Sequence, residues 1–168
     1  HPEYSDHVTL RVVEGPQADY FTSSGLDTFY SEAYTVTQES DRMGCRLDGP
    51  AITSCHGSDI ISDGIVFGSI QITSAGRPII LMADRQTTGG YAKIGTVCTA
   101  DLPVIAQCQP GAIIHFKKIS VEEAQKLLQT AQGLNVRPES FLSEKNKYME
   151  DSGRIFYLLN QRRFFNMD

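Results

Sequence analysis

The chain has 168 residues, of which 40% are hydrophobic, and it carries a net charge of −5 at pH 7. This length accommodates one domain with a hydrophobic core, on a prior of roughly 150 residues per domain. Basic residues are scattered apart from Lys117-Lys118 and Arg162-Arg163, which argues against nucleic acid as a partner. No apolar stretch approaches the ~20 residues that cross a bilayer, so we expect a soluble, cytoplasmic protein without a membrane partner.

Short apolar runs between turn signals predict a series of β-strands. We expect these strands at residues 9–13, 34–37, 43–48, 65–73, 78–83, 91–97 and 112–118. Asp63-Gly64 predicts a turn before the fourth strand, and residues 74–77 predict a hairpin after it. Strands therefore dominate the expected fold.

Two short helices are expected between the strands. A cap at Ser23 or Ser24 predicts a helix over residues 26–33. Asp101 is expected to cap a helix of one or two turns with Pro103 in its first turn.

A third helix follows the last strand. Ser120 and Glu123 have the spacing of a capping box, which predicts a helix that runs to about residue 132. Residues 135–168 are richer in charge and predict a helical extension, packed either on the same domain or on a partner chain.

The polar stretch Asp84–Tyr91 lies between two predicted strands and combines a charged pair, an amide, two hydroxyls, two glycines and a phenol. Paired glycines let backbone N–H groups approach a bound oxygen closely, while Gln86, Thr87 and Thr88 donate and accept hydrogen bonds. We interpret it as a recognition loop for a small polar group. The alternative is that Gly89-Gly90 forms an ordinary hairpin turn.

The cysteines and histidines predict neither a metal site nor a nucleophile. Cys45, Cys55, Cys98 and Cys108 contain no C-x-x-C pair and no histidines at zinc spacing, so we expect reduced thiols in or near the core. His115 lies in an apolar strand, where a structural role is the simpler interpretation.

Several collinear segments resemble one known family. They cover residues 10–17, 40–50 (SDRMGCRLDGP), 68–72, 76–91 (GRPIILMADRQTTGGY), 100–103 and 107–111. In order and spacing they are similar to the C-terminal half of the allophanate hydrolase subunit 2 family, which includes the C subunit of 5-oxoprolinase, KipA and part of the carboxyltransferase region of urea carboxylase. The resemblance runs from about residue 8 to about residue 131.

The resemblance implies a mainly β fold, namely a cyclophilin-like closed β-barrel with a few short helices, over residues 1–132. Residues 133–168 form the helical extension in this division. The N-terminal half that family members usually have is missing before His1. We therefore expect either a fragment of a longer protein or a half supplied by another chain.

The family's substrates share a planar amide or ureido group, which implies a site built from hydrogen-bond donors and a cation. Residues 86–90 can supply the donors, and Arg42, Arg46 and Lys93 can supply the cation. Asp84 or Asp63 can orient them or accept a proton. The predicted catalytic residues are Asp84, Lys93 and Arg46, and the predicted substrate-binding residues are Gln71, Gln86, Thr87, Thr88, Gly89, Gly90, Tyr91 and Arg42.

Structural interpretations of the same residues stay open. Arg42 and Arg46 can pair with nearby acids such as Asp41 or Asp48. Asp84 can simply close a turn, and Tyr91 can be a half-buried strand residue. Because successive side chains of a strand point to opposite faces, Gln71 points away from its apolar neighbours, towards either solvent or a barrel mouth.

The resemblance implies part of an enzyme like 5-oxoprolinase, as its C subunit, or like a biotin-dependent carboxyltransferase, and this part would be inactive alone. Its partners would be a KipI-like B subunit, the missing N-terminal half, and either the A subunit or a biotin carboxylase. No cofactor is expected on this chain, because ATP or carboxybiotin would come from the partner subunits. The alternative is a KipA-like regulator that binds and antagonises a KipI-type inhibitor of a sensor histidine kinase. Urea, 5-oxoproline and carboxybiotin all stay open as substrates.

Overall fold

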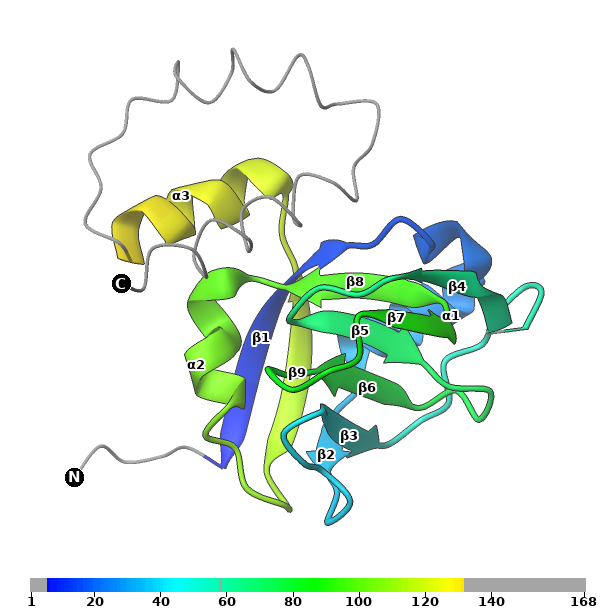
Figure 1. Ribbon diagram of the computed structural model, residues 1–168, viewed down its shortest axis with the longest axis horizontal. Helices are drawn as coiled ribbons and strands as arrows, with labels where there is room; N and C mark the ends of the chain where they lie inside the picture. The colour runs from blue at the N-terminus through cyan, green and yellow to red at the C-terminus, as the bar shows by residue number, and fades with distance from the viewer. Residues whose placement is uncertain (1–5, 58, 132–168) are drawn as a thin grey trace.

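The computed structural model describes residues 6–57 and 59–131 of the chain, and its central feature is a closed barrel of seven strands (Figure 1). In spatial order the barrel strands are β1 (His7–Glu14), β8 (Lys93–Val97), β5 (Ser69–Ile72), β6 (Pro78–Leu81), β3 (Gly44–Asp48), β2 (Tyr34–Val36) and β9 (Ile113–Lys118). β9 closes the barrel by pairing with β1 in parallel, whereas the other neighbours are antiparallel. The predicted mainly β fold with a closed barrel is confirmed.

Apolar side chains that alternate along the strands fill the barrel. Leu10, Ile70, Ile80, Ile94 and Ile114 are each 0% exposed. Burial of side chains of this size stabilises the fold by roughly 1.5–3 kcal/mol each. The core therefore holds the strands on which the candidate site is built.

Helix α1 (Ser23–Ser31) packs on β9, and its Phe29 ring stacks on Phe116 with a centroid distance of 4.3 Å. The predicted caps at Ser23 and Ser24 are wrong. Thr22 is the N-cap, and its side chain accepts a hydrogen bond from the Gly25 N–H at 2.9 Å. The helix begins earlier than the apolar pattern indicated, because Thr22 has the extended backbone that an N-cap needs.

The second predicted helix is present as a 3₁₀ turn, η2 (Thr99–Asp101), followed by α2 (Leu102–Ile105). Asp101 is the N-cap residue of α2, as predicted, but its side chain makes no capping hydrogen bond. Its carboxylate instead accepts hydrogen bonds from Arg11, from the backbone N–H at 2.8 Å and from the guanidinium Nε at 2.9 Å. This 90-residue separation explains why local sequence reasoning assigned Asp101 a local role.

Helix α3 (Val121–Ala131) confirms the capping box. The Ser120 N–H donates to the Glu123 carboxylate at 2.8 Å, and the Glu123 N–H donates to the Ser120 hydroxyl at 3.1 Å. Among residues 6–57 and 59–131 no helix is long and apolar enough to cross a membrane. The predicted extension over residues 133–168 lies outside the described residues.

Two further strands, β4 (Asp59–Gly64) and β7 (Thr88–Tyr91), pair with each other in a separate antiparallel sheet. A 3₁₀ turn, η1 (Ala18–Tyr20), lies between β1 and α1. The predicted turn at Asp63-Gly64 is wrong, because these residues end β4. The strand predicted over 65–73 is present but shorter, as β5 covers only Ser69–Ile72. β4 and β7 had no predicted counterpart and position the candidate site.

Candidate functional site

The sheet β4–β7 forms a layer over the outer face of the barrel strands β5, β6 and β8 (Figure 1). Ile70, Ile72 and Ile94 point into the barrel core, so Gln71 and Lys93 point outwards. The pairing of β5 with β8 sets Gln71 opposite Lys93. Both side chains are nevertheless buried, at 6% and 7% exposure, because the β4–β7 layer covers them.

Ile65 joins the layer to the barrel. Its side chain is buried with Ile79 and Leu81 of β6 in a small apolar cluster separate from the barrel core. Its backbone N–H donates to the Thr87 carbonyl at 3.0 Å, which extends the pairing of β4 with β7 by one residue. This contact holds the layer against the face that carries Gln71 and Lys93.

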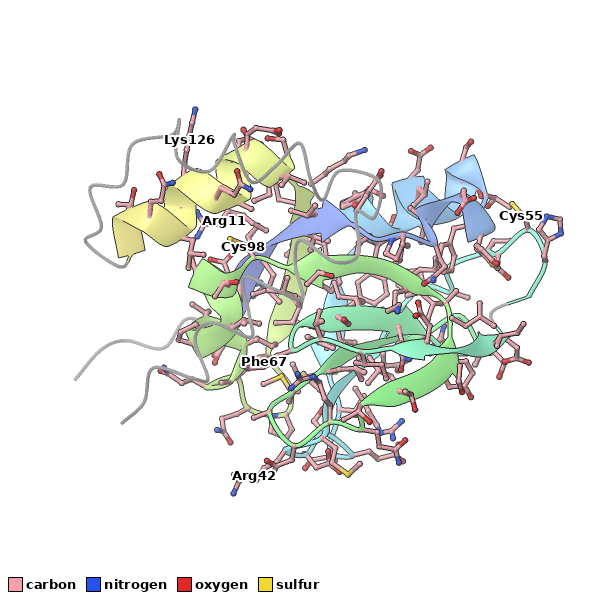
Figure 2. All side chains as sticks on the ribbon, turned by 45° about the horizontal axis from the view of Figure 1, so that its top comes forward. Arg11, Arg42, Cys55, Phe67, Cys98 and Lys126 are labelled. Atoms are coloured by element: carbon pink, nitrogen blue, oxygen red, sulfur yellow. The ribbon has the colours of Figure 1, made fainter. Side chains whose placement is uncertain are left out.

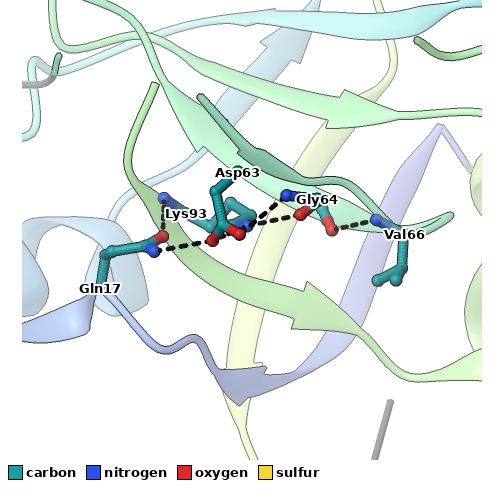
Figure 3. Close-up of polar contacts among 6 residues, drawn as sticks. Gln17, Asp63, Gly64, Val66 and Lys93 are labelled. Carbon is teal, nitrogen blue, oxygen red and sulfur yellow. Dashed lines mark hydrogen bonds and ion pairs between the residues drawn. The ribbon is translucent and has the colours of Figure 1, made fainter. Parts of the chain in front are cut away.

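Lys93 is the centre of a polar network beneath the layer (Figure 3). Its ammonium donates to the Asp63 carboxylate at 2.7 Å and to the Gly64 carbonyl at 2.6 Å. Gln17 ties the network to the end of β1. It donates to Asp63 at 3.2 Å and accepts from the Lys93 backbone N–H at 3.1 Å.

The electrostatics of this network follow from unequal burial. The Lys93 side chain is 8% exposed, whereas the Asp63 side chain is 51% exposed. The hydrogen bond from Lys93 holds the pKa of Asp63 below its ordinary value, although partial burial opposes this effect. The Lys93 ammonium is therefore fixed, and the Asp63 carboxylate faces both Lys93 and solvent.

Gln71 has a buried amide nitrogen, Nε2, without a hydrogen-bond partner among the described residues. It lies against Gly89 of β7: a Cβ added there would come within 2.6 Å of both Gln71 Nε2 and Ile65 Cδ1. Gly89 has no positive φ, so glycine is needed here for close approach and not for a turn. The layer thus encloses an unsatisfied N–H donor next to a lysine.

Only the first half of the predicted recognition loop, residues 84–87, lies outside the strands. Thr88–Tyr91 is strand β7, so Gly89-Gly90 lies inside a strand and forms neither a loop nor a hairpin turn. The strand exists because β4 pairs with it from a distant part of the chain: Asp63 lies opposite Gly89. Gln86, Thr87 and Thr88 are exposed. Gly90 is also exposed, and Tyr91 is half-buried.

Arg42 and Asp84 pair with each other, with Arg42 Nε and Asp84 Oδ2 3.0 Å apart. The side chains are 85% and 51% exposed, and a pair so exposed stabilises a fold by about 0–1 kcal/mol. Figure 2 shows Arg42 at the edge of the molecule. The alternative of a surface ion pair is therefore borne out for Arg42, with Asp84 as the partner, while Asp48 pairs with Arg77 at 2.9 Å.

Arg46 lies on β3 and is exposed, so it does not join Lys93 either. Of the predicted residues, the structure therefore brings together Lys93, Gln71 and Gly89. It does not bring Arg42, Arg46 and Asp84 into this group.

Sequence reasoning missed two residues of this region. Gln17 is 76 residues from Lys93 in the sequence, and no local pattern indicates the hydrogen bond between them. Arg85 was passed over among its polar neighbours, yet its guanidinium lies over the Phe67 ring at 5.8 Å from the centroid. Phe67 is labelled in Figure 2.

The arrangement favours stabilisation of negative charge on an oxygen. A lysine ammonium has three donors, and two of them are used by Asp63 and Gly64. The remaining donor and the Gln71 N–H come from paired positions on neighbouring strands. Preorganised donors in a site shielded from water stabilise developing oxyanions by several kcal/mol, about 2.7–4 kcal/mol for one donor.

Comparison with known proteins gives independent evidence on the family of this chain. The family described as carboxyltransferase domain, subdomain A and B, matches residues 1–118. The C subunit of 5-oxoprolinase from Haemophilus influenzae is 39% identical over 118 residues, which cover 70% of this chain and 38% of that protein. The C subunit of 5-oxoprolinase from Escherichia coli is 37% identical over 123 residues, which cover 73% of this chain and 40% of that protein.

The solved structure of the K. lactis urea amidolyase shares the fold, with a TM-score of 0.72 at 24% identity. The match covers 78% of this chain and 9% of that protein. The chain spans about two fifths of the length of the two curated relatives, at 38% and 40%.

Proposed function

Because this chain belongs to the carboxyltransferase domain family, subdomain A and B, we propose that it is part of an enzyme that acts on a small amide or ureido substrate. This membership confirms the family resemblance of the sequence. The two curated relatives are named as the C subunit of 5-oxoprolinase, which supports an enzyme of that type. The same proposal includes a second enzyme type, a biotin-dependent carboxyltransferase.

The observation that carries the proposal is the juxtaposition of a buried lysine with a buried amide donor. Lys93 is held by Asp63 at 2.7 Å. Gln71, opposite it in the strand pairing, has an Nε2 without a partner in the described part of the chain. An amide oxygen gains negative charge when a nucleophile attacks its carbonyl carbon. In the proposed site Gln71 donates to that oxygen, and Lys93 neutralises the charge.

The rest of the catalytic machinery would come from other polypeptides. We place a KipI-like B subunit beside this chain, with the A subunit or a biotin carboxylase as a further partner. ATP or carboxybiotin would be supplied by those partners. In this scheme the chain provides the oxyanion-stabilising donors and does not turn over substrate alone.

Reconstitution tests the proposal. The full-length protein is mixed with its candidate A and B subunits, and ATP-dependent consumption of 5-oxoproline is measured beside biotin- and ATP-dependent carboxylation of urea. We expect one of the two reactions to depend on all components. Absence of both reactions in an assembly shown to be intact by size-exclusion chromatography contradicts the enzyme proposal.

The second candidate is a KipA-like regulator that binds and antagonises a KipI-type inhibitor. It is favoured by one observation, namely that Gln86, Thr87 and Thr88 are exposed on and before β7 and are not enclosed in a site. A regulator would bind the KipI-like protein tightly, and replacement of Lys93 by methionine would leave that binding unchanged. Relief of kinase inhibition without substrate turnover would identify this role.

A further inference from the structure

Gln17 joins three segments of the proposed site that are far apart in the sequence. It follows β1, and its side chain donates to the Asp63 carboxylate of β4 at 3.2 Å and accepts from the Lys93 backbone N–H of β8 at 3.1 Å (Figure 3). The Lys93 N–H can only donate, so the Gln17 amide oxygen must face it and the amide N–H must face Asp63. One amide group therefore holds the layer strand β4 to the barrel strand β8.

The strand pairing is irregular next to the point where Gln17 binds. The pairing of β5 with β8 shifts its register between Ile70 and Gln71, beside the pair that Gln71 makes with Lys93. Such a bulge changes the direction of the side chains next to it. The bond from the Lys93 N–H to Gln17 supports the backbone at this shift, and so helps to set the direction in which the Lys93 side chain leaves the strand.

Three donors hold the Asp63 carboxylate. Oδ2 accepts from Lys93 at 2.7 Å and from Gln17 at 3.2 Å, and Oδ1 accepts from the Gly64 N–H at 2.8 Å. These bonds keep the pKa of Asp63 below its ordinary value, mainly through Lys93 and in smaller part through Gly64 and Gln17. Gly64 is the next residue in the chain, so Gln17 supplies the bond that comes from outside β4 and β8. It restrains a carboxylate that is 51% exposed and would otherwise turn towards water.

We propose that Gln17 is the positioning residue of the site: it fixes the Asp63 carboxylate, which in turn fixes the Lys93 ammonium where negative charge develops on the substrate oxygen. This inference rests on the proposed function. Gln17 is half-buried and acts through Asp63 and Lys93, not through contact with the substrate. A preorganised cation needs no reorganisation during the reaction, so loosening it slows turnover more than it weakens substrate binding.

The test compares replacements of Gln17 in the assembled full-length enzyme. Gln17→Met keeps the length of the side chain and removes both bonds, whereas Gln17→Glu keeps the acceptor for the Lys93 N–H and loses the donor to Asp63. Gln107→Met is the matched control, because Gln107 is an exposed glutamine just after α2 and outside this network. For each variant, kcat and KM are measured for 5-oxoproline or urea, whichever the reconstituted assembly consumes. The pKa of Asp63 is followed by carbon NMR in the full-length protein.

We expect Gln17→Met to lower kcat by about 10- to 100-fold, as for the loss of a hydrogen bond to a charged group, with KM within about twofold of the wild type. Gln17→Glu should lower kcat at least as much, because it adds a second negative charge beside Asp63. The pKa of Asp63 should rise towards its ordinary value in Gln17→Met. Gln107→Met should match the wild type in every measurement.

A double variant separates positioning from a general effect on stability. If Gln17 acts through Asp63, the effects of the two replacements on kcat are not additive, so in an Asp63→Ala background Gln17→Met should lower kcat by less than about threefold. A residue that only stabilises the fold would lower kcat by the same factor in both backgrounds.

Wild-type kcat in Gln17→Met or in Gln17→Glu, in an assembly shown to be intact, overturns the inference while leaving the proposed function intact. Full additivity in the Asp63→Ala background overturns it as well. If Gln17→Met does not assemble, Gln17→Glu and the pKa of Asp63 in the unassembled Gln17→Met chain decide, and an unchanged pKa overturns the inference. Wild-type kcat in Lys93→Met contradicts the proposed function itself.

Discussion

Lys93 is more constrained than any arginine in the predicted site. Its side chain is only 8% exposed, and the bonds of its ammonium to Asp63 and Gly64 fix its position. Arg42, by contrast, is 85% exposed and pairs weakly with Asp84. A fixed cation is better suited to act as a preorganised electrostatic group, so we propose Lys93, and not Arg42, for the catalytic role.

Removal of the two partners of this pair should have unequal effects on stability. Asp63→Ala leaves the buried ammonium without its carboxylate and should lower the free energy of unfolding by about 2–3 kcal/mol. Lys93→Met leaves a half-exposed carboxylate that water can solvate, so its cost should be about 1 kcal/mol. Urea unfolding of both variants measures the difference.

Asp59→Ala is the matched control for that comparison because Asp59 is an exposed carboxylate on the same strand, β4. Its effect should stay within about 0.5 kcal/mol. A larger loss for Lys93→Met than for Asp63→Ala would show that the carboxylate does not hold the lysine.

The lowered pKa of Asp63 predicts the sign of a pH effect. The pKa in the folded protein lies below the ordinary value of 3.8, so the ionised carboxylate stabilises the fold above that pH. This stabilisation is lost as the pH falls through the lower folded value. The difference in unfolding free energy between the wild type and Asp63→Asn should be constant from about pH 5 to about pH 7 and shrink below about pH 4.

Denaturant unfolding at several pH values measures this difference. The pKa of Asp41 is also lowered, mainly by a hydrogen bond from the Gly44 N–H. Asp41 is present in both proteins, so its contribution to the pH dependence cancels in the difference. A difference that grows as the pH falls would contradict the Asp63–Lys93 bond.

At the scale of elements, the β4–β7 layer decides which residues of the polar motif face the barrel. β7 brings Gly89 against Gln71 and leaves Thr88 exposed. β4 contributes Asp63 and Gly64 to Lys93. The site therefore depends on a two-stranded sheet that is not part of the barrel.

Gly89 and Gly90 should respond differently to replacement by alanine. At Gly89 the new Cβ would lie 2.6 Å from both Gln71 Nε2 and Ile65 Cδ1, and because both side chains are buried, the layer must shift. We expect Gly89→Ala to lower the unfolding free energy by about 1–2 kcal/mol. Gly90→Ala has its nearest contact at an ordinary 3.6 Å and should cost less than about 0.5 kcal/mol.

Thermal and urea unfolding of the two variants measure this contrast. In the assembled enzyme, Gly89→Ala should also weaken 5-oxoproline binding, because it displaces the Gln71 amide. Equal stability of the two variants would mean that the layer does not press on Gln71.

The sequence predicts most elements of the barrel. The elements that it does not predict, β4 and β7, have a common cause in long-range pairing. The capping box of α3 is local, with Ser120 and Glu123 three residues apart, and it forms as expected. β4 and β7 depend on the pairing of Asp63 with Gly89, distant in the chain, and their Asp-Gly and Gly-Gly pairs are typical of turns. Long-range pairing overrides such local preferences.

The site residues follow the same rule. Lys93 and Gln71 could be predicted from polar positions in apolar strands. Gln17 could not be predicted, because its bonds to Lys93 and Asp63 join distant segments.

At the scale of the molecule, we propose that the barrel is the support and that the layer on its outer face carries the chemistry. Outward-facing residues of β5 and β8 are covered although they do not belong to the barrel core. The family and the fold are shared with proteins in which this unit is a minor part, since the chain spans 38–40% of the curated relatives. We therefore expect activity only in a larger assembly.

The most direct measurement is the rate of ATP-dependent 5-oxoproline hydrolysis by the assembled full-length enzyme, compared between Lys93→Met and Arg77→Met. Loss of one oxyanion-stabilising donor corresponds to a fall in kcat of about 100- to 1000-fold. Such a fall is predicted for Lys93→Met, with the assembly intact and Arg77→Met at the wild-type rate. Wild-type turnover by Lys93→Met would contradict the proposal that Lys93 acts in the active site.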